Sequence, residues 1–512
     1  MSQDQPTRAV RTDWVMFAAT VAVITGACLP LVLFREESSA WVTAAYDVIT
    51  RNFGIAYLWY GFGLVVFLLC LAGSRFGEVR LGGTAAVPEF STRSWIAMLF
   101  SAGIGAGLLY WAVIEWGYYV DAPPLGVAPA STAAVEWAAT YGLFHWGITG
   151  WAIFCLPTLA IAYPYHNRGV PFLRLSTGCL PFLPGGPASR RGRALDFLYM
   201  TNLIGGTGTS LGLSTPMIAA GVARLLGIEH DFHLEVAVVL GCIAVFGTSA
   251  WVGLQGGFRR MADANMFLAI GLLLFILLVG PTVFILKMAT NSLGLMAQSF
   301  LRMNTWTDPV ENRGFVESWT VFYWAWWIAY GPFVGIFVTR ISRGRSLREV
   351  IFGMLAFGSL GAWLFFMVLG NYALHLDLSG ALDLRGLVKQ GEEALAITTA
   401  MASLPGGLAV LAVFVAVAVV FLATTYDSAS YTLASVSTHE LRAGVDPARW
   451  HRVFWACALG VLPVTLMFLE GGLKVILSAT IVVSLPLVAV GILMCVSLIR
   501  MLKEDCSQAG SR

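Results

Sequence analysis

Stretches of about 20 apolar residues, the length that an α-helix needs to cross a bilayer, recur along the whole chain. They lie near residues 13–34, 53–73, 95–117, 136–163, 196–226, 233–255, 264–288, 317–339, 350–373, 403–436, 453–470 and 473–499. Hydrophobic residues make up 58% and charged residues 12% of the 512 positions, whereas about a quarter of the residues in a soluble domain are charged. The pattern predicts an all-α membrane protein with twelve transmembrane helices.

The positions of lysine and arginine support this count. With the amino terminus in the cytoplasm and loops that alternate sides, 22 of the 31 Lys and Arg residues fall on the cytoplasmic side. The positive-inside rule describes such a bias, so both termini are predicted to be cytoplasmic. The net charge of +2 gives no indication of a nucleic-acid partner. The eight cysteines are scattered singly, without the spacing of a disulfide framework or a metal site.

Two predicted helices carry glycine or proline near their middle. The third span contains SAGIGAG, Ser101 to Gly107, and the eighth contains Gly331-Pro332 with Gly335 beyond. Taken alone, either could serve close packing of helices through small residues, and proline kinks a helix. Because each stands in the first helix of a five-helix block, the pair predicts an inverted repeat whose unwound backbone contacts substrate and ions.

These blocks predict the organisation of the chain. The segment NSLGLMAQSFLRM, Asn291 to Met303, has apolar residues at helical spacing and little charge, which favours a helix lying along the outer interface. The predicted parts are 1–94 (tail and two leading helices), 95–288 (first repeat), 289–316 (interfacial helix and loop), 317–500 (second repeat) and 501–512 (short tail).

The segment SWTVFYWAWWIAYGPFVG begins at Ser318, and its part from Trp319 to Tyr330 crowds four tryptophans and three other aromatic residues into one predicted helix. Five of these rings share one helical face: Trp319, Tyr323, Trp326, Trp327 and Tyr330. An interfacial aromatic belt would sit at the helix ends, but this stripe runs over three turns. Packing in the core of the bundle is the other alternative, and it explains the off-stripe rings.

The functional interpretation of the stripe is a cation–π box. A quaternary ammonium group has no N–H donor, so hydrogen bonds to the cation cannot select it. Aromatic faces attract it instead, with about 2 kcal/mol or more for a desolvated contact. Tyr118, Tyr119 and Trp146 could complete the box. His145 beside Trp146 is either a hydrogen-bonded core residue or part of a proton relay.

The motifs WTVFYWAWW and ISRGRSLRE, with FSAGIGAG and FHWG before them, resemble the betaine/carnitine/choline transporter family over essentially the whole chain. The resemblance implies a LeuT-like fold of five plus five helices after two leading helices, a bacterial inner-membrane location and a homotrimer joined partly by the interfacial helix. It also implies a secondary transporter of a quaternary ammonium or sulfonium solute.

The resemblance further implies roles for individual residues. Trp146, Trp326, Trp327, Tyr330 and Tyr118 would line the central site. Trp319 would hold substrate transiently farther out, and a substrate carboxylate would meet backbone amides near Gly103, Gly105 and Gly107.

The mode of coupling has two interpretations. Tyr330 resembles the sodium-independent carnitine/γ-butyrobetaine exchangers, and so does Arg259, which falls where those exchangers place an arginine in lieu of sodium. A positive-inside anchor is the alternative for Arg259.

Residues typical of sodium-coupled members are also present. Thr424 and Thr425, with backbone carbonyls near Ser101 and Ile104, could ligate a sodium ion. Phe333 after Pro332 also resembles the sodium-coupled members. An exchanger or cation-independent carrier is expected, with a sodium- or proton-coupled symporter of glycine betaine or choline as the alternative.

Glu115 and Asp427 are the carboxylates deepest in the predicted spans. Intramembrane acids are candidates for function, either in proton coupling or as structural hydrogen-bond acceptors. An intramembrane enzyme is disfavoured, because the sequence has no nucleophile–base pair at motif spacing and no metal cluster. A channel would need a pore lined by polar or charged rings. No cofactor is expected, apart from a possible sodium ion.

Overall fold

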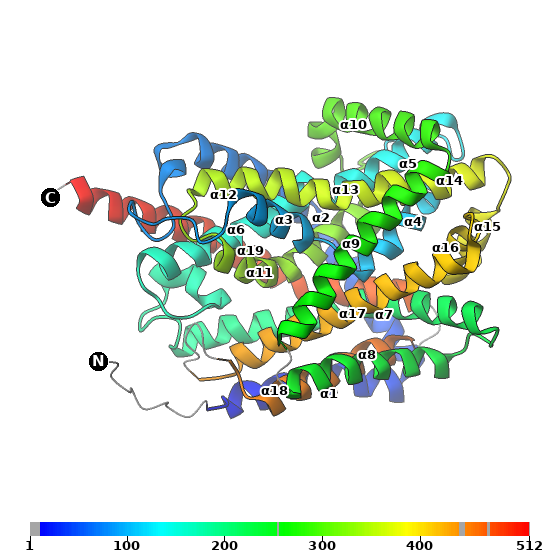
Figure 1. Ribbon diagram of the computed structural model, residues 1–512. Helices are drawn as coiled ribbons and strands as arrows, with labels where there is room; N and C mark the ends of the chain where they lie inside the picture. Colours follow the sequence, from blue (N-terminus) through cyan, green and yellow to red (C-terminus); the bar gives the residue numbers. More distant parts are fainter. Residues whose placement is uncertain (1–10, 253–254, 440–445, 468–471, 511–512) are drawn as a thin grey trace.

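The computed structural model describes residues 11–252, 255–439, 446–467 and 472–510 (Figure 1). In these residues the regular structure is helical, and the β-type contacts are two isolated bridges. The α-helices are α1 (Trp14–Leu33), α2 (Arg35–Gly73), α3 (Thr92–Ala102), α4 (Ala106–Asp121), α5 (Thr132–His145), α6 (Ile148–Asn167), α7 (Arg190–Leu226), α8 (Phe232–Val252), α9 (Gln255–Val279), α10 (Thr282–Thr305), α11 (Phe322–Ile341), α12 (Leu347–Gly353), α13 (Ser359–Phe365), α14 (Asn371–Leu378), α15 (Leu384–Lys389), α16 (Glu393–Ala402), α17 (Gly407–Val436), α18 (Arg449–Met467) and α19 (Gly472–Gly510). Two 3₁₀ segments, η1 (Arg75–Glu78) and η2 (Leu175–Phe182), and three π-helical segments, η3 (Val316–Val321), η4 (Met354–Gly358) and η5 (Phe366–Gly370), connect or interrupt them.

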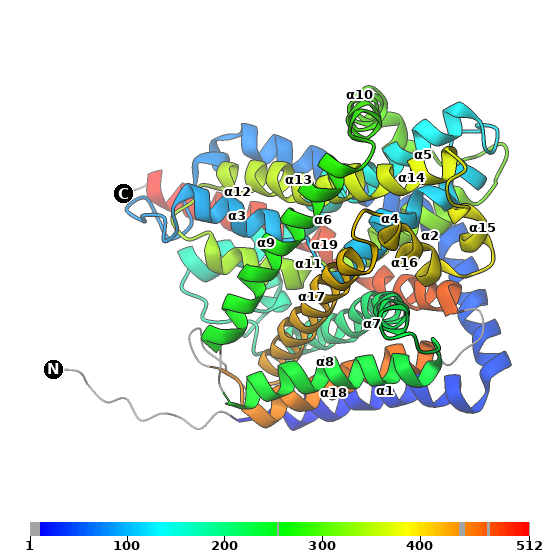
Figure 2. The ribbon, with the colours of Figure 1, turned by 45° about the vertical axis from the view of Figure 1, so that its right-hand side comes forward.

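Eight helical segments of the described chain are long and apolar enough to cross a membrane, or nine when the bent pair α3–α4 counts as one span. The remaining predicted spans, 196–226, 233–255 and 453–470, coincide with helices α7, α8 and α18. The structure is therefore an all-helical bundle of membrane type, and the number twelve stays a prediction. In Figures 1 and 2, α1, α8 and α18 lie side by side along one edge of the bundle.

The predicted break in the third span is confirmed. Helices α3 and α4 meet at an angle of 61°, and α4 begins at Ala106 after the glycine-rich turn. Gly103 permits this turn to lie against α6, because a Cβ atom there would be 2.5 Å from Cζ2 of Trp151. The backbone amides at the start of α4 lack intrahelical carbonyl partners, as at any helix amino terminus.

The predicted break at Gly331-Pro332 is wrong, since α11 continues through Pro332 to Ile341. The glycines of this segment serve close packing on α6 instead. A Cβ atom on Gly331 would lie 3.3 Å from Cγ of Pro157, and one on Gly335 would lie 2.9 Å from the amide nitrogen of Thr158. The irregular part of this span is the π-helical segment η3, which precedes α11.

The predicted interfacial helix at 291–303 lies inside a longer helix, α10. The preceding span was predicted to reach residue 288, but α9 ends at Val279, and Pro281 caps α10. Gly280 and Pro281 are a turn signal that ends the helix earlier than hydropathy alone indicates. Figure 2 shows α10 end-on beside helices α12, α13 and α14 seen lengthwise, so α10 crosses them at the edge of the bundle.

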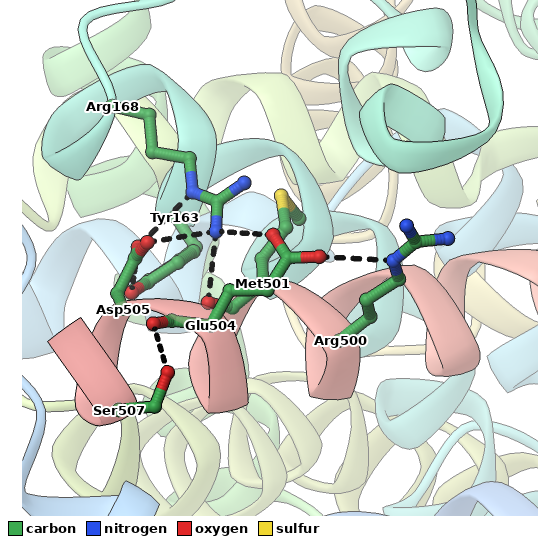
Figure 3. Close-up of polar contacts among 7 residues, drawn as sticks. All are labelled: Tyr163, Arg168, Arg500, Met501, Glu504, Asp505 and Ser507. Carbon is green, nitrogen blue, oxygen red and sulfur yellow. Dashed lines mark hydrogen bonds and ion pairs between the residues drawn. The ribbon is translucent and has the colours of Figure 1, made fainter.

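The last turns of α19 are held against the end of α6. The guanidinium of Arg168 donates to both carboxylate oxygens of Asp505, at 2.8 and 3.0 Å, and to Glu504 Oε2 at 3.0 Å (Figure 3). It also donates to the carbonyl of Met501, and the Tyr163 hydroxyl donates to Asp505 Oδ2 at 2.6 Å. We call this group of contacts the C-terminal anchor. It fixes the helix that ends the chain to the helix on which α11 packs.

Candidate functional site

A cavity of about 1020 Å³ lies between the α3–α4 break, α11 and α17. Binding sites for small molecules range from about 300 to 1,000 Å³, so this space can hold a small solute and part of its access path. It collects most of the predicted binding and coupling residues: Ser101, Gly103, Ile104, Gly105, Gly107, Trp146, Trp326, Trp327, Tyr330, Phe333, Thr424, Thr425 and Asp427.

Four aromatic residues form one wall of this cavity, and we call them the aromatic cluster: Trp146, Trp326, Trp327 and Tyr330. The rings of Trp326 and Trp327 stack with centroids 5.0 Å apart and an interplanar angle of 10°. Trp146 meets both edge to face, at 5.9 and 4.7 Å, and Tyr330 meets Trp326 edge to face at 6.2 Å. Contacts of this kind stabilise aromatic pairs, so the wall is built from rings that hold one another in place.

The indole N–H groups of Trp326 and Trp327 donate to backbone carbonyls of other helices. Trp327 Nε1 donates to the carbonyl of His145 at 2.9 Å, and Trp326 Nε1 donates to the carbonyl of Gly206 at 3.1 Å. The His145 carbonyl is available because α5 ends at that residue. Since buried polar groups need partners, these bonds fix the orientation of both rings.

A second helix interruption, which the sequence reasoning missed, places Trp146 at the cavity. Helix α5 ends at His145, α6 begins at Ile148, and Trp146-Gly147 forms the junction. A Cβ atom on Gly147 would lie 2.5 Å from the carbonyl oxygen of Leu143 and 2.7 Å from Nε1 of Trp363. The only sequence signal for this junction is the glycine after FHW, which hydropathy does not distinguish from a packing glycine.

The α3–α4 break faces the aromatic cluster. A Cβ atom on Gly107 would be 3.2 Å from Oγ of Ser210 and 3.5 Å from the ring of Trp326. The amino terminus of α4 therefore approaches the rings closely, and its free amides and positive dipole end favour an anionic group nearby. The arrangement can hold an aromatic-bound cation and a carboxylate of the same small molecule.

Oxygen-bearing side chains of α17 lie across from this break. The hydroxyls of Thr424 and Thr425 both donate to the carbonyl of Phe421, at 2.8 and 2.9 Å. The Thr425 hydroxyl is 4.0 Å from the position that a Cβ atom on Gly105 would take. The lone pairs of these oxygens suit a hard cation such as sodium. Among the described residues, no group of three or more His, Cys, Asp or Glu side chains could hold a metal ion.

At one end the cavity is lined by four charged residues and a tyrosine, and we call this the arginine end: Arg340, Asp427, Tyr431, Asp446 and Arg452. Arg452 donates to Asp427 at 2.7 Å, and its guanidinium carbon lies 5.3 Å from the Tyr431 ring centroid. Arg340 lies 5.4 Å from the same ring, whose hydroxyl donates to Asp446. Asp427 is thus held in an ion pair, which favours its structural interpretation. Arg340 and Asp446 are exposed, so the cavity reaches the surface here.

Beyond the opposite end of the aromatic cluster lies a packed group of rings, which we call the closed end: Trp111, Tyr118, Tyr119 and Trp319. Trp319 meets Trp111 edge to face at 5.6 Å and Tyr119 at 4.8 Å. Tyr118 packs on Trp319 and donates to Glu393 of α16 at 2.6 Å. Tyr118 and Trp319 therefore do not line the cavity, and their contacts with substrate stay a prediction.

One further predicted residue, Glu115, also lies away from the cavity wall. Glu115 is buried behind Trp146, with 1% of its surface exposed. Arg259 falls in the first turns of α9, but its side chain lies outside the described residues. The sequence did not predict that Trp111 packs on Trp319 or that Ser210 lines the cavity beside Gly107. Neither residue stands in an aromatic stripe or a helix break.

Comparisons with known proteins agree with this architecture. The sequence pattern of the betaine/carnitine/choline family transporters matches residues 15–507. The chain is 36% identical over 446 residues to the uncharacterized transporter YeaV of Escherichia coli strain K12. The aligned region covers 86% of this chain and 91% of that protein. The chain is also 31% identical over 514 residues to a protein of Acinetobacter baumannii named carnitine transporter, which covers 100% of this chain and 92% of the relative.

Proposed function

The chain belongs to the betaine/carnitine/choline transporter family, and from this premise we propose that it carries a quaternary ammonium solute of the carnitine, γ-butyrobetaine or betaine type. It is a transporter and not an enzyme, as its family membership states. The aromatic cluster on the cavity wall is the observation that supports the proposed substrate class. Rings attract a cation that has no N–H donor.

The proposed binding mode uses both walls of the cavity. The trimethylammonium group lies against Trp326, Trp327 and Trp146, and the carboxylate of a zwitterionic substrate meets the amino terminus of α4 near Gly105 and Gly107. The cation requires desolvated rings, whereas the anion requires free N–H groups. The relative named carnitine transporter makes carnitine the first substrate to test.

Transport by alternating access follows from the difference between the two ends of the cavity. The arginine end reaches the surface, while the closed end is sealed by Trp111, Tyr119 and Trp319. By the positive-inside rule the arginine end faces the cytoplasm, so this arrangement is the state that exchanges solute with the cytoplasm. Release to the other side requires the closed end to open and the arginine end to close.

The proposed fold is a LeuT-like repeat of five plus five helices after two leading helices, with twelve spans in the bacterial inner membrane. The broken pair α3–α4 stands at the start of the first repeat. In Figures 1 and 2 the start of α1 and the end of α19 lie on the same side of the bundle. An even number of membrane crossings requires this arrangement. A homotrimer is proposed, with α10 at the subunit contacts because it lies at the edge of the bundle.

For coupling we propose exchange or cation-independent transport. Tyr330 at the cavity wall is the residue that supports this interpretation through its resemblance to the exchangers. The alternative is sodium-coupled symport of glycine betaine or choline, for which Thr424, Thr425 and carbonyls near Ser101 would supply the oxygen ligands. Proton coupling through Glu115 or Asp427 is a further alternative.

Counterflow in proteoliposomes tests both the substrate class and the coupling. Vesicles loaded with unlabelled carnitine are diluted into labelled carnitine with or without sodium. A carrier accumulates label transiently above equilibrium, whereas a channel only equilibrates it and an enzyme changes the solute chemically. Accumulation without sodium supports exchange, and its absence without sodium supports the symporter. No accumulation of carnitine, γ-butyrobetaine, glycine betaine or choline in either medium would refute the proposed function.

The variant Arg259→Glu refines the coupling test. If Arg259 replaces a sodium ion, its loss should stop counterflow in sodium-free medium, and sodium should restore part of it. If Arg259 is only a positive-inside anchor, counterflow in sodium-free medium should stay near the wild-type rate.

A further inference from the structure

Glu115 of α4 lies in a fully buried polar group directly behind the aromatic cluster. Its exposed fraction is 1%, and those of Tyr119, Tyr323 and His145 are 0%. Tyr119 donates to Oε1 at 2.7 Å, and Trp146 Nε1 donates to Oε2 at 3.3 Å. The hydroxyl of Tyr323 also donates to Oε2. The carboxylate therefore accepts three hydrogen bonds from three aromatic side chains.

Three donors surround the carboxyl group of Glu115, an arrangement that suits an ionised carboxylate. An indole N–H can only donate, so Oε2 is an acceptor, and an ionised carboxylate accepts at both oxygens. The Tyr119 hydroxyl, having donated to Glu115, accepts from Nδ1–H of His145 at 3.0 Å. On its other side, His145 Nε2 lies 3.1 Å from the hydroxyl oxygen of Thr320.

No ion pair with a lysine or an arginine joins Glu115 within the described residues. Within the described chain the only basic side chain within 4.0 Å of Glu115 is His145, at 3.8 Å. The other titratable groups around it are Tyr119 of α4 and Tyr323 of α11, which donate to it, and Tyr141 of α5, which packs on Tyr119. A buried carboxylate without a positive partner is unfavourable, so a nearby positive charge would stabilise it.

The carboxylate is one ring away from the cavity. Trp146, which donates to Glu115, also lines the cavity and meets the rings of both Trp326 and Trp327. Tyr323, the other donor to Oε2, stacks on Trp327 with centroids 5.7 Å apart. Trp146 and Tyr323 therefore each join Glu115, through a hydrogen bond, to the rings of the aromatic cluster.

We propose that Glu115 is the counter-charge of the aromatic cluster and a positioning residue for Trp146. This inference rests on the proposed function, because it requires a cationic substrate at the cavity wall. Glu115 orients the indole through its N–H and makes the electrostatic potential at the wall negative. Two unit charges about 10 Å apart at an effective dielectric of about 20 change an affinity by roughly tenfold. Glu115 thus distinguishes a cation from a neutral molecule of the same shape.

The test compares a cation with its neutral isostere. Choline and 3,3-dimethylbutan-1-ol have the same shape, but only choline carries a charge. Affinities of the purified protein for both, and for carnitine, are measured by quenching of tryptophan fluorescence. In Glu115→Gln the affinity for choline and carnitine should fall roughly tenfold, while that for the neutral isostere should change by less than about twofold. Equal losses for cation and isostere would overturn the proposal, because they indicate a purely structural role.

Two variants control for folding and geometry. Glu115→Asp keeps the charge and should restore most of the preference for the cation. Tyr323→Phe removes one hydrogen bond but leaves the carboxylate, and it should keep the wild-type ratio of choline to isostere affinity. If Tyr323→Phe lost this preference as fully as Glu115→Gln, the counter-charge role would be refuted. If wild type bound neither choline nor carnitine, the proposed function would fail instead, which the first measurement shows.

Discussion

The two halves of the aromatic stripe on η3 and α11 are both built from tryptophan and tyrosine but have different surroundings. Trp326, Trp327 and Tyr330 lie on the wall of the cavity, opposite glycines and threonines. Trp319 and Tyr323 are buried against rings of α4 and have no access to it. The difference teaches that the element across from an aromatic residue decides whether its ring can receive a ligand or only packs.

The same contrast separates a sealed end from an open end. Ring packing and the hydrogen bond from Tyr118 to Glu393 seal the closed end. At the arginine end the contacts among Arg340, Tyr431 and Arg452 leave the cavity in reach of the surface. Polar and charged side chains thus line the open end of the cavity, and packed rings fill the closed end.

The largest expected effect comes from removing a ring of the aromatic cluster. Trp327→Leu should weaken carnitine binding by at least a hundredfold, because it removes a cation–π contact of about 2 kcal/mol and the ring on which Trp146 and Tyr323 pack. Trp319→Leu, in the other half of the stripe, should weaken it much less. Fluorescence titration and counterflow measure both. Equal losses in the two variants would break the distinction between the halves.

A smaller effect is expected from filling the space opposite the rings. Gly107→Val should weaken binding by roughly ten- to a hundredfold, because a side chain there meets Ser210 and Trp326 and occupies the room of the substrate. Gly63→Val in α2 is the matched control, since nothing lies within 4 Å of a Cβ atom at that position. Wild-type affinity in Gly107→Val would show that the substrate does not approach the α4 terminus.

Removal of one hydroxyl group should weaken the packing at the closed end. Tyr118→Phe removes the hydrogen bond to Glu393, a charge-assisted bond whose loss is expected to cost on the order of 1 kcal/mol at a half-buried position. Hydrogen–deuterium exchange in Glu393–Ala402 should rise about fivefold. Tyr431→Phe, which removes the bond to Asp446 at the arginine end, should leave exchange in that helix unchanged. No increase in Tyr118→Phe would mean that ring packing alone holds the seal.

The smallest effect is expected at the C-terminal anchor, which belongs to neither half of the stripe. Arg168→Gln removes the contacts to Asp505, Glu504 and Met501. Because these partly exposed pairs contribute about 1 kcal/mol or less, the melting temperature should fall by a few degrees or less while substrate affinity stays unchanged. Arg500→Gln, which removes only the exposed pair with Glu504, should have a still smaller effect. A large loss of affinity in Arg168→Gln would show that the anchor shapes the cavity.

The sequence predicted well the features that depend on local composition. Apolar length placed most helices, and glycine at every second position from Ser101 to Gly107 placed the α3–α4 break. The Gly331-Pro332 break was predicted wrongly, because the same residues that interrupt a helix also allow close packing, here of α11 on α6. The junction at Trp146-Gly147 was missed for the same reason, since one glycine in an apolar run carries no information about its neighbours.

By itself the sequence determined that this is a helical membrane protein with one aromatic stripe suited to a quaternary ammonium group, because hydropathy and ring count are properties of single segments. Only the tertiary structure decided that Trp326, Trp327 and Tyr330 line the cavity while Trp319 does not. It alone placed Glu115 behind Trp146 with three donors around its carboxylate. The physical reason is that hydrogen bonds and ring contacts join residues of different helices, and the spacing within one helix does not specify what lies opposite it.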